Sequence, residues 1–419
     1  MAKKTNGKNK GQIALYLVLT LALVAFLVSI VISNSLQKSS LISDQSLLNA
    51  LSEYFDKSPS KITQEDLDSI ACLGFAGNDT IAFGTAEALE DTDPEDVLSS
   101  LTSAALPRPL EDLEADLALF KNLKLLDFSG DAFALTSISQ LKGVAGLEHL
   151  NLAHTKPQGL SDLASFTGLV TLQLHGIPVD DFSFIEELTA LETLDISETG
   201  ATDLSVLSGL KNLKKLVADE NDISDLTPLS ALTGIEELSL NNNGIADVTA
   251  LADFTALTTL SLDGNTLYNF EGLESVKTIK NLSAADNSIS TLSHLSGLTE
   301  LTSLTVSKNH LIDLDGLQTV EHLSVLYADD NEIIEVDAIA GLVELSYLNL
   351  ADNSLTNVDV LESLVGLKTL ILTGNRIASL TALDGLKETG LSITADPVTE
   401  ENSEAITEET DTETEITED

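Results

Sequence analysis

An asparagine recurs every 22 residues through the second half of this 419-residue chain. The eight members of the series are Asn221, Asn243, Asn265, Asn287, Asn309, Asn331, Asn353 and Asn375. Around the first seven, apolar residues lie five and three positions before the asparagine, and two, five, eight, eleven and fourteen positions after it; Asn375 keeps all but the last. A constant period over this length indicates a repeat array, in which each unit buries its apolar face against the next.

The apolar lattice continues beyond the asparagines in both directions. Towards the N-terminus Thr155, Ile177 and Thr199 take the asparagine position, and one further unit ends near Asp131. Towards the C-terminus, Leu391 and Ile393 precede Asp396 after an interval of 21 residues. We therefore expect about thirteen coils over residues 120–396.

Each unit contains the stretch x-L-x-L-x, whose period of two predicts a short strand with both leucines facing inward. Identical strands of successive coils pair in parallel, and helical or 3₁₀ turns return on the far side. The fold class is thus an α/β solenoid. The asparagine follows the strand, and its amide can bond backbone groups of its own coil and the neighbouring coil. We interpret the eight asparagines as a structural ladder, because an unpaired buried amide costs roughly 1–3 kcal/mol.

The pattern LxxLxLxxNxIxDLxxLxxLxx resembles the 22-residue leucine-rich repeat of bacterial internalins, and of eukaryotic phosphatase regulatory subunits in the same repeat class. The resemblance implies a right-handed horseshoe with a parallel sheet on its concave face, used for binding other proteins. No C-terminal LPxTG sorting signal is present, which departs from the wall-anchored internalins.

The N-terminus predicts a membrane anchor. Residues 1–12 carry Lys3, Lys4, Lys8 and Lys10, and an apolar run over residues 13–32 follows, broken only by Thr20 and Ser29. Such a run spans about 30 Å as a helix, which matches the hydrocarbon thickness of a bilayer. The lysines place residues 1–12 in the cytosol and the chain after residue 33 outside. We favour an uncleaved anchor over residues 13–33; a cleaved signal peptide is the alternative.

The regions flanking the repeats differ from the lattice. Residues 34–119 are expected to form a helical cap like the one that precedes bacterial leucine-rich repeats. Its first helix has a capping box of Thr63 and Asp66, carries a buried Cys72 and ends at Gly74; a second begins after Asp93. Residues 397–419 form an acidic tail with ten acids and no base, for which we expect disorder.

The composition argues against several classes of function. The chain has 67 acidic and 21 basic residues, a net charge of −46, so its surface repels nucleic acid. A single cysteine excludes an intramolecular disulfide. We find no catalytic motif and expect no enzyme, no cofactor and no metal; His149 and His175 are expected about 13 Å apart, too far to share an ion.

The best candidates for a binding surface are outward-facing strand positions. Most are small and polar, but Val325, Tyr327, Tyr347 and Ile371 fall within cross-strand or diagonal reach on three successive strands. Exposed tyrosines among aliphatic residues are typical of interface anchors. A second candidate cluster is His149, Asn151, Gln173 and His175.

The hypothesis from the sequence is a monomeric, single-pass bacterial membrane protein whose extracellular repeat domain binds a protein or cell-wall ligand through its concave face. One alternative is a structural spacer of the cell envelope without a specific ligand. Another is an intracellular regulatory subunit like the phosphatase subunits of this repeat class, which the predicted membrane helix argues against.

Overall fold

The computed structural model describes residues 41–42, 44–75, 80–89, 101–106, 112–129, 135–144 and 146–397. The chain divides into two compact units, Met1–Leu147 and Glu148–Asp419. Within the described ranges, no helix is both long enough and apolar enough to cross a membrane. The predicted anchor over residues 13–33 and the acidic tail over residues 398–419 lie outside those ranges.

The first unit opens with two short helices, α2 (Gln45–Tyr54) and α3 (Gln64–Asp68), separated by the 3₁₀ turn η1 (Pro59–Lys61). The Asp44 side chain accepts hydrogen bonds from the amides of Ser46 and Leu47 and so caps α2. The predicted capping box of α3 is present, because Thr63 and Asp66 bond each other's backbone amides.

The segment around Cys72 is a strand, not the continuation of a helix that the sequence predicted. Cys72 and Gly74 lie in strand β1 (Cys72–Phe75), which pairs antiparallel with β2 (Thr80–Gly84) and parallel with β4 (Leu125–Asp127). Strand β3 (Thr102–Ala105) extends this sheet next to β2. The apolar run around Cys72 is too short for its periodicity to separate strand from helix, and pairing with two strands decides the matter. The second predicted helix, from Asp93, lies outside the described residues.

The same unit also contains η2 (Ala86–Leu89), α5 (Leu113–Leu117) and η3 (Ile138–Leu141). Cys72 is buried, as predicted, and burial raises the pKa of its thiol to about 11. A neutral, enclosed thiol of this kind packs as a small apolar residue.

The second unit is a solenoid built on one parallel sheet. Its strands are β5 (His149–Asn151), β6 (Thr171–Gln173), β7 (Thr193–Asp195), β8 (Lys215–Val217), β9 (Glu237–Ser239), β10 (Thr259–Ser261), β11 (Asn281–Ser283), β12 (Ser303–Thr305), β13 (Val325–Tyr327), β14 (Tyr347–Asn349), β15 (Thr369–Ile371) and β16 (Ser392–Thr394). From β5 to β15 each residue pairs with the one 22 positions later, so the register repeats the sequence period.

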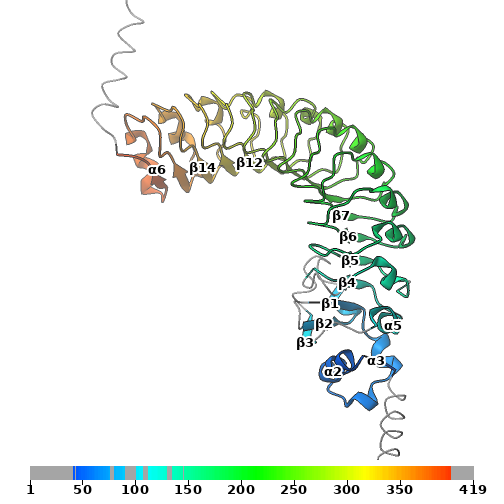
Figure 1. The fold of residues 1–419 in the computed structure, drawn as a ribbon. Helices are drawn as coiled ribbons and strands as arrows, with labels where there is room; N and C mark the ends of the chain where they lie inside the picture. Colours follow the sequence, from blue (N-terminus) through cyan, green and yellow to red (C-terminus); the bar gives the residue numbers. More distant parts are fainter. Residues whose placement is uncertain are drawn as a thin grey trace, which may run out of the picture. The chain divides into compact units, whose positions relative to one another are not determined.

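Short 3₁₀ turns return the chain on the outer side of the curve, and the strands line its inner side (Figure 1). These turns are η4 (Leu160–Ser165), η5 (Ser183–Glu187), η6 (Ser205–Leu207), η7 (Thr227–Leu229), η8 (Thr249–Leu251), η9 (Leu273–Ser275), η10 (Ser293–Leu295), η11 (Asp337–Ile339), η12 (Asp359–Ser363) and η13 (Thr381–Leu383). A 3₁₀ turn covers a given distance with fewer residues than an α-helix does. The outer side of each coil can therefore be completed within a 22-residue unit.

The core consists of stacked aliphatic side chains. Leu282, Leu304 and Leu326, the middle residues of three neighbouring strands, are each 2% exposed or less, and they pair directly. The lattice positions after the first seven asparagines are buried in the same way, so one continuous apolar column fills these coils. Each coil thus completes the core of its neighbours, as a repeat array requires.

A left-handed residue precedes the asparagine position in eleven successive coils. The residues are His154, Gly176, Glu198, Glu220, Asn242, Gly264, Asp286, Lys308, Asp330, Asp352 and Gly374, all with φ between +52° and +73°. In ten of them the amide donates to a backbone carbonyl of the following coil, as Asp330 does to Ala351 at 2.9 Å. Eight of the eleven are not glycine, and the inter-coil hydrogen bonds offset the modest cost of this conformation.

The last strand differs from the predicted alignment. Leu370 pairs with Ile393 rather than with Leu391, a step of 23 residues, and helix α6 (Asp384–Glu388) precedes the strand. The shift of two residues keeps the same side chains inward, because strand side chains alternate. Asp396 does not take the asparagine role; its side chain accepts the Gly374 amide at 2.6 Å and so replaces the carbonyl that a further coil would supply.

Candidate functional site

The eight asparagines join each coil to the one before it by a repeated set of hydrogen bonds. In every case Oδ1 accepts the amide 20 residues earlier, and Nδ2 donates to the carbonyl 25 residues earlier. Nδ2 also donates to the carbonyls two and three residues before it in its own coil, as Asn309 does to Ser307 and Val306. Both ends of each amide are therefore occupied by backbone, so these side chains serve the fold and leave nothing for a ligand.

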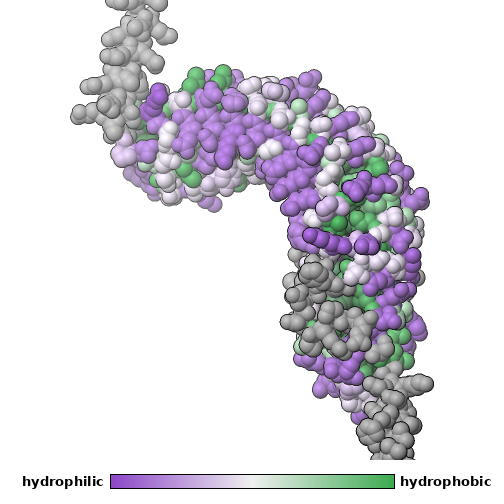
Figure 2. Space-filling view, viewed as in Figure 1, coloured by the Kyte–Doolittle hydropathy of each residue, from purple (hydrophilic) through white to green (hydrophobic). Residues whose placement is uncertain are grey.

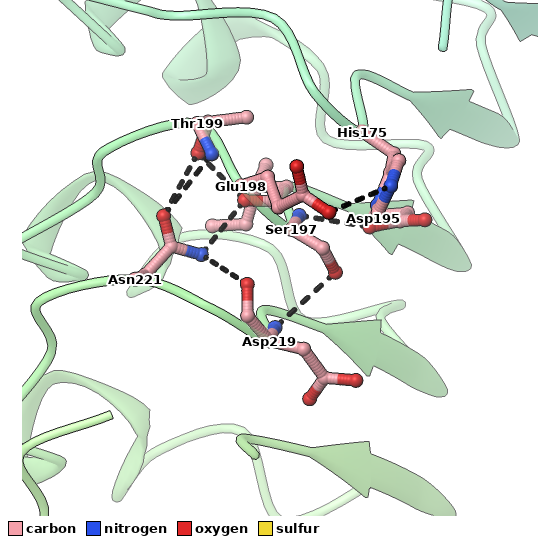
Figure 3. A network of polar contacts seen from close by, with 8 residues as sticks. His175, Asp195, Ser197, Glu198, Thr199, Asp219 and Asn221 are labelled. Atoms are coloured by element: carbon pink, nitrogen blue, oxygen red, sulfur yellow. Dashed lines mark hydrogen bonds and ion pairs between the residues drawn. The ribbon is translucent and has the colours of Figure 1, made fainter. Parts of the chain in front are cut away.

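The ladder begins where threonine gives way to asparagine (Figure 3). The Thr199 hydroxyl donates to its own coil's Ile196 carbonyl at 2.6 Å. This bond corresponds to the one that each asparagine makes to the carbonyl three residues before it. Asn221 then accepts the amides of Thr199 and Ala201. The side chain of a threonine is too short to make the bond to the preceding coil as well, and Thr155 likewise bonds its own coil's Leu152 carbonyl.

Outward-facing strand positions define the concave face, and a part of it carries no charge. On β10 to β15 the twelve outward side chains are Thr259, Ser261, Asn281, Ser283, Ser303, Thr305, Val325, Tyr327, Tyr347, Asn349, Thr369 and Ile371. On β7 to β9, by contrast, three of the six are Asp195, Lys215 and Glu237. We call the six-strand stretch the neutral face. In a protein of net charge −46 it is a local interruption of the acidic surface.

Tyr347 is the centre of the first candidate cluster. It pairs directly with Val325 across the strands, and its ring contacts that of Tyr327 with centroids 4.8 Å apart. Ile371 lies diagonally across the next strand, where its direct partner is Asn349. All four side chains are half-buried. Burial, and then hydrogen bonding with Tyr327, raise the pKa of Tyr347, so its hydroxyl stays neutral and available as a donor at physiological pH.

A row of hydrogen-bonded polar side chains follows the ends of the strands along the concave face. Asp219 accepts the Ser239 hydroxyl and the Asn241 amide, both at 2.7 Å. Asn241 and Asp263 repeat the pattern on the following coils, and Asp329 accepts from Ser307 and Asn349. Because these carboxylates are engaged by neighbouring coils, the network positions the strand ends.

The structure divides the second candidate cluster. Asn151 and Gln173 pair across the strands, but His149 bonds the Thr171 hydroxyl at 3.0 Å. His175 lies beyond the end of β6, where its ring contacts His154 at a centroid distance of 4.6 Å. Its Nε2 lies 3.4 Å from a Glu198 oxygen, as the close-up in Figure 3 shows. His154 was not among the predicted site residues, although it lies one period before Gly176 in the left-handed row.

Sequence reasoning also missed Tyr268, Ile312 and Ile334, which lie three residues after a ladder asparagine and are exposed. The repeat does not require an apolar residue three positions after the asparagine. A large hydrophobic residue there could therefore have been recognised as a surface residue. In the part of the chain that the structure describes, no group of three or more His, Cys, Asp or Glu side chains is placed to hold a metal ion.

Comparison with known proteins agrees with this architecture. The family described as Leucine Rich repeats (2 copies) matches residues 211–255. An internalin, InlF, of Listeria monocytogenes superposes with a TM-score of 0.70 and 26% identity over 87% of this chain and 98% of that one. Sequence comparison with curated proteins gave no match.

Two further structures share the fold at lower identity. The functional domain of InlJ from Listeria monocytogenes, which includes a cysteine ladder, superposes with a TM-score of 0.57 and 16% identity over 85% of this chain and 80% of that one. A leucine-rich repeat protein of Leptospira interrogans gives a TM-score of 0.54 and 20% identity over 67% of this chain and 80% of that one. The parallel sheet, the 22-residue register and these likenesses together show a leucine-rich repeat fold that is similar to that of the internalin InlF.

Proposed function

We propose that this chain is a non-enzymatic, membrane-anchored protein of the bacterial cell surface that binds another protein through the neutral face. The observation that carries the binding role is the contact of Tyr327 with Tyr347 on a stretch of concave surface whose outward strand positions hold no charged side chain. A half-buried tyrosine pair offers apolar area at low cost in side-chain entropy, together with hydroxyl groups that can hydrogen-bond. A plant receptor kinase ectodomain of this fold was solved in complex with CASPARIAN STRIP INTEGRITY FACTOR 2, which supports a protein or peptide ligand.

The charge distribution favours a partner other than a second copy of this chain. Acidic residues dominate the rest of the surface, and over the C-terminal coils the view in Figure 2 is largely hydrophilic. Self-association would bring two surfaces of the same sign together, so the protein itself acts as a monomer. A neutral ligand surface with apolar side chains loses little solvation on meeting the neutral face.

A photo-crosslinking experiment on cells tests the binding role. Benzoylphenylalanine replaces Thr305, which pairs directly with Tyr327; the matched control replaces Ser239 on β9, beside Glu237. We expect a covalent protein adduct from position 305, none from position 239, and loss of the adduct when Tyr327→Ala and Tyr347→Ala are added. An adduct that only wall-digesting enzymes release would identify a glycan ligand instead. If no adduct forms from either position, the role of a spacer is favoured.

Anchoring is supported by the apolar run over residues 13–32 and the four lysines before it. Protease added to intact cells is expected to remove the acidic tail, and N-terminal sequencing of the membrane fraction is expected to begin near Met1. A new N-terminus after residue 33 would mean that the segment is a cleaved signal. A tail that resists protease until the cells are lysed would contradict the surface location and favour an intracellular regulatory subunit.

A further inference from the structure

A second surface lies on the edge of the solenoid that follows the strands. Among the described residues, six large hydrophobic side chains are exposed, and three of them occupy one lattice position, three residues after a ladder asparagine. They are Tyr268, Ile312 and Ile334, with 63%, 53% and 59% of their surface accessible. We call this row, with Ser290 between its members, the asparagine edge.

Backbone hydrogen bonds join the members of the asparagine edge in two pairs, and the parallel strands of these coils pair in register. The Ile334 amide donates to the Ile312 carbonyl at 3.0 Å, and the Ser290 amide donates to the Tyr268 carbonyl at 3.3 Å. The row therefore covers four successive coils at a separation of about 5 Å each, close to the strand spacing. This geometry makes the three side chains one surface feature.

The fold does not require apolar residues at this position. In the three coils before Tyr268 the same position holds Thr202, Ser224 and Ala246, and in each the amide one residue earlier still donates to the asparagine of the next coil. Isolated exposed hydrophobic residues are common on soluble proteins. Three large ones aligned where the lattice accepts Ser or Thr are better explained by contact with a partner.

The charges around the row limit the kind of partner. Exposed carboxylates flank it at Glu271, Asp315, Glu332 and Glu335, and Glu332 also contacts His310 at 3.2 Å. A second copy of this chain would bring the same acidic rim against itself, and an anionic lipid surface would be repelled. A partner that covers the row therefore needs apolar side chains between basic ones.

The spacing favours a helix in that partner. One turn of an α-helix rises 5.4 Å, close to the separation of about 5 Å between successive coils. A helix laid along the row can present one apolar side chain per turn to each coil, while its lysines and arginines face the rim. We propose that the asparagine edge binds a cationic amphipathic helix of a partner protein, at a site separate from the neutral face.

Synthetic peptides test this proposal on the full chain, held in phosphatidylcholine nanodiscs with empty nanodiscs as the blank. One 18-residue Leu/Lys peptide carries its leucines on a single helical face; a second has the same composition with the leucines scrambled around the helix. We expect fluorescence anisotropy to show at least tenfold tighter binding of the first peptide. The triple variant Tyr268→Ser, Ile312→Ser, Ile334→Ser is expected to reduce that affinity to the level of the scrambled peptide.

The chain offers a matched control on the opposite edge. Val343 and Val365 are also exposed, at 52% and 71%, but they lie in the turns that lead into β14 and β15. The double variant Val343→Ser, Val365→Ser should leave peptide binding unchanged. The double variant Tyr327→Ala, Tyr347→Ala should also leave it unchanged, so this test can fail independently of the test of the neutral face. Equal binding of both peptides, or unchanged binding by the triple variant, would overturn the proposal. If the wild type instead self-associates with increasing concentration and the triple variant does not, the proposal is overturned, and the asparagine edge binds a second copy of the chain.

Discussion

Replacing Asn309 by alanine is expected to lower the free energy of unfolding by about 1–3 kcal/mol, although the residue belongs to neither proposed binding surface. Asn309 is 5% exposed, and its Oδ1 accepts the Ile289 amide at 2.9 Å. The carbonyls of Ala284 and Val306 keep a second donor in Asn287 and Asn331. The cost is therefore concentrated in one buried amide that loses its partner.

Urea unfolding of the full chain, with hydrogen exchange at the Ile289 amide, measures both parts of this prediction. The matched control is Asn281→Ala, because Asn281 is exposed on β11 and makes only a 3.4 Å contact with the Thr259 hydroxyl. That variant should unfold like the wild type. Unchanged protection of Ile289 in Asn309→Ala would mean that another group satisfies this amide and that the ladder is not needed for stability.

Replacing Gly316 by alanine is expected to destabilise the protein by about 2–5 kcal/mol, the sum of a left-handed backbone and a steric overlap. Its φ is +112°, and a Cβ there would lie 2.2 Å from the carbonyl oxygen of Leu292 and 2.9 Å from the nitrogen of Ser293. Both atoms are backbone of the preceding coil, which cannot move without displacing the stack.

Thermal unfolding of Gly316→Ala beside Gly341→Ala tests the prediction. Gly341 lies in the next coil and does not have a left-handed φ, and a methyl group added to it would meet no atom within 4 Å beyond its chain neighbours. Its replacement is expected to be neutral, or to stabilise by about 0.4–1 kcal/mol by restricting the unfolded chain. Equal unfolding temperatures for the two variants would show that neighbouring coils can shift to accept the methyl group.

The placement of the candidate binding residues followed largely from periodicity. Because the register equals the sequence period, Val325, Tyr327 and Tyr347 could be assigned to neighbouring strands from the sequence, and the ring contact agrees with that assignment. Periodicity could not show that His175 lies past the end of its strand, where its neighbours are His154 and Glu198. That arrangement depends on the turn geometry of three coils together.

The ends of the array depart most from the sequence reasoning. Cys72 lies in a strand because β2 and β4 supply pairing partners on both sides, which no local pattern around it could reveal. At the other end, α6 shifts the alignment of Ile393 by two residues, since either register keeps the apolar side chains inward. Terminal coils have a neighbour on one side only, so their conformation is less constrained by repetition.

By itself, the sequence determined the solenoid, its 22-residue register and the ladder of asparagines, because identical coils must satisfy identical apolar and backbone requirements. The tertiary structure alone decided that His175 lies beside His154 and Glu198, and that Tyr268, Ile312 and Ile334 are exposed at one lattice position. The physical reason is that the core restricts inward residues through burial. Outward residues are free to vary, so their meaning depends on what the stacking of coils places beside them.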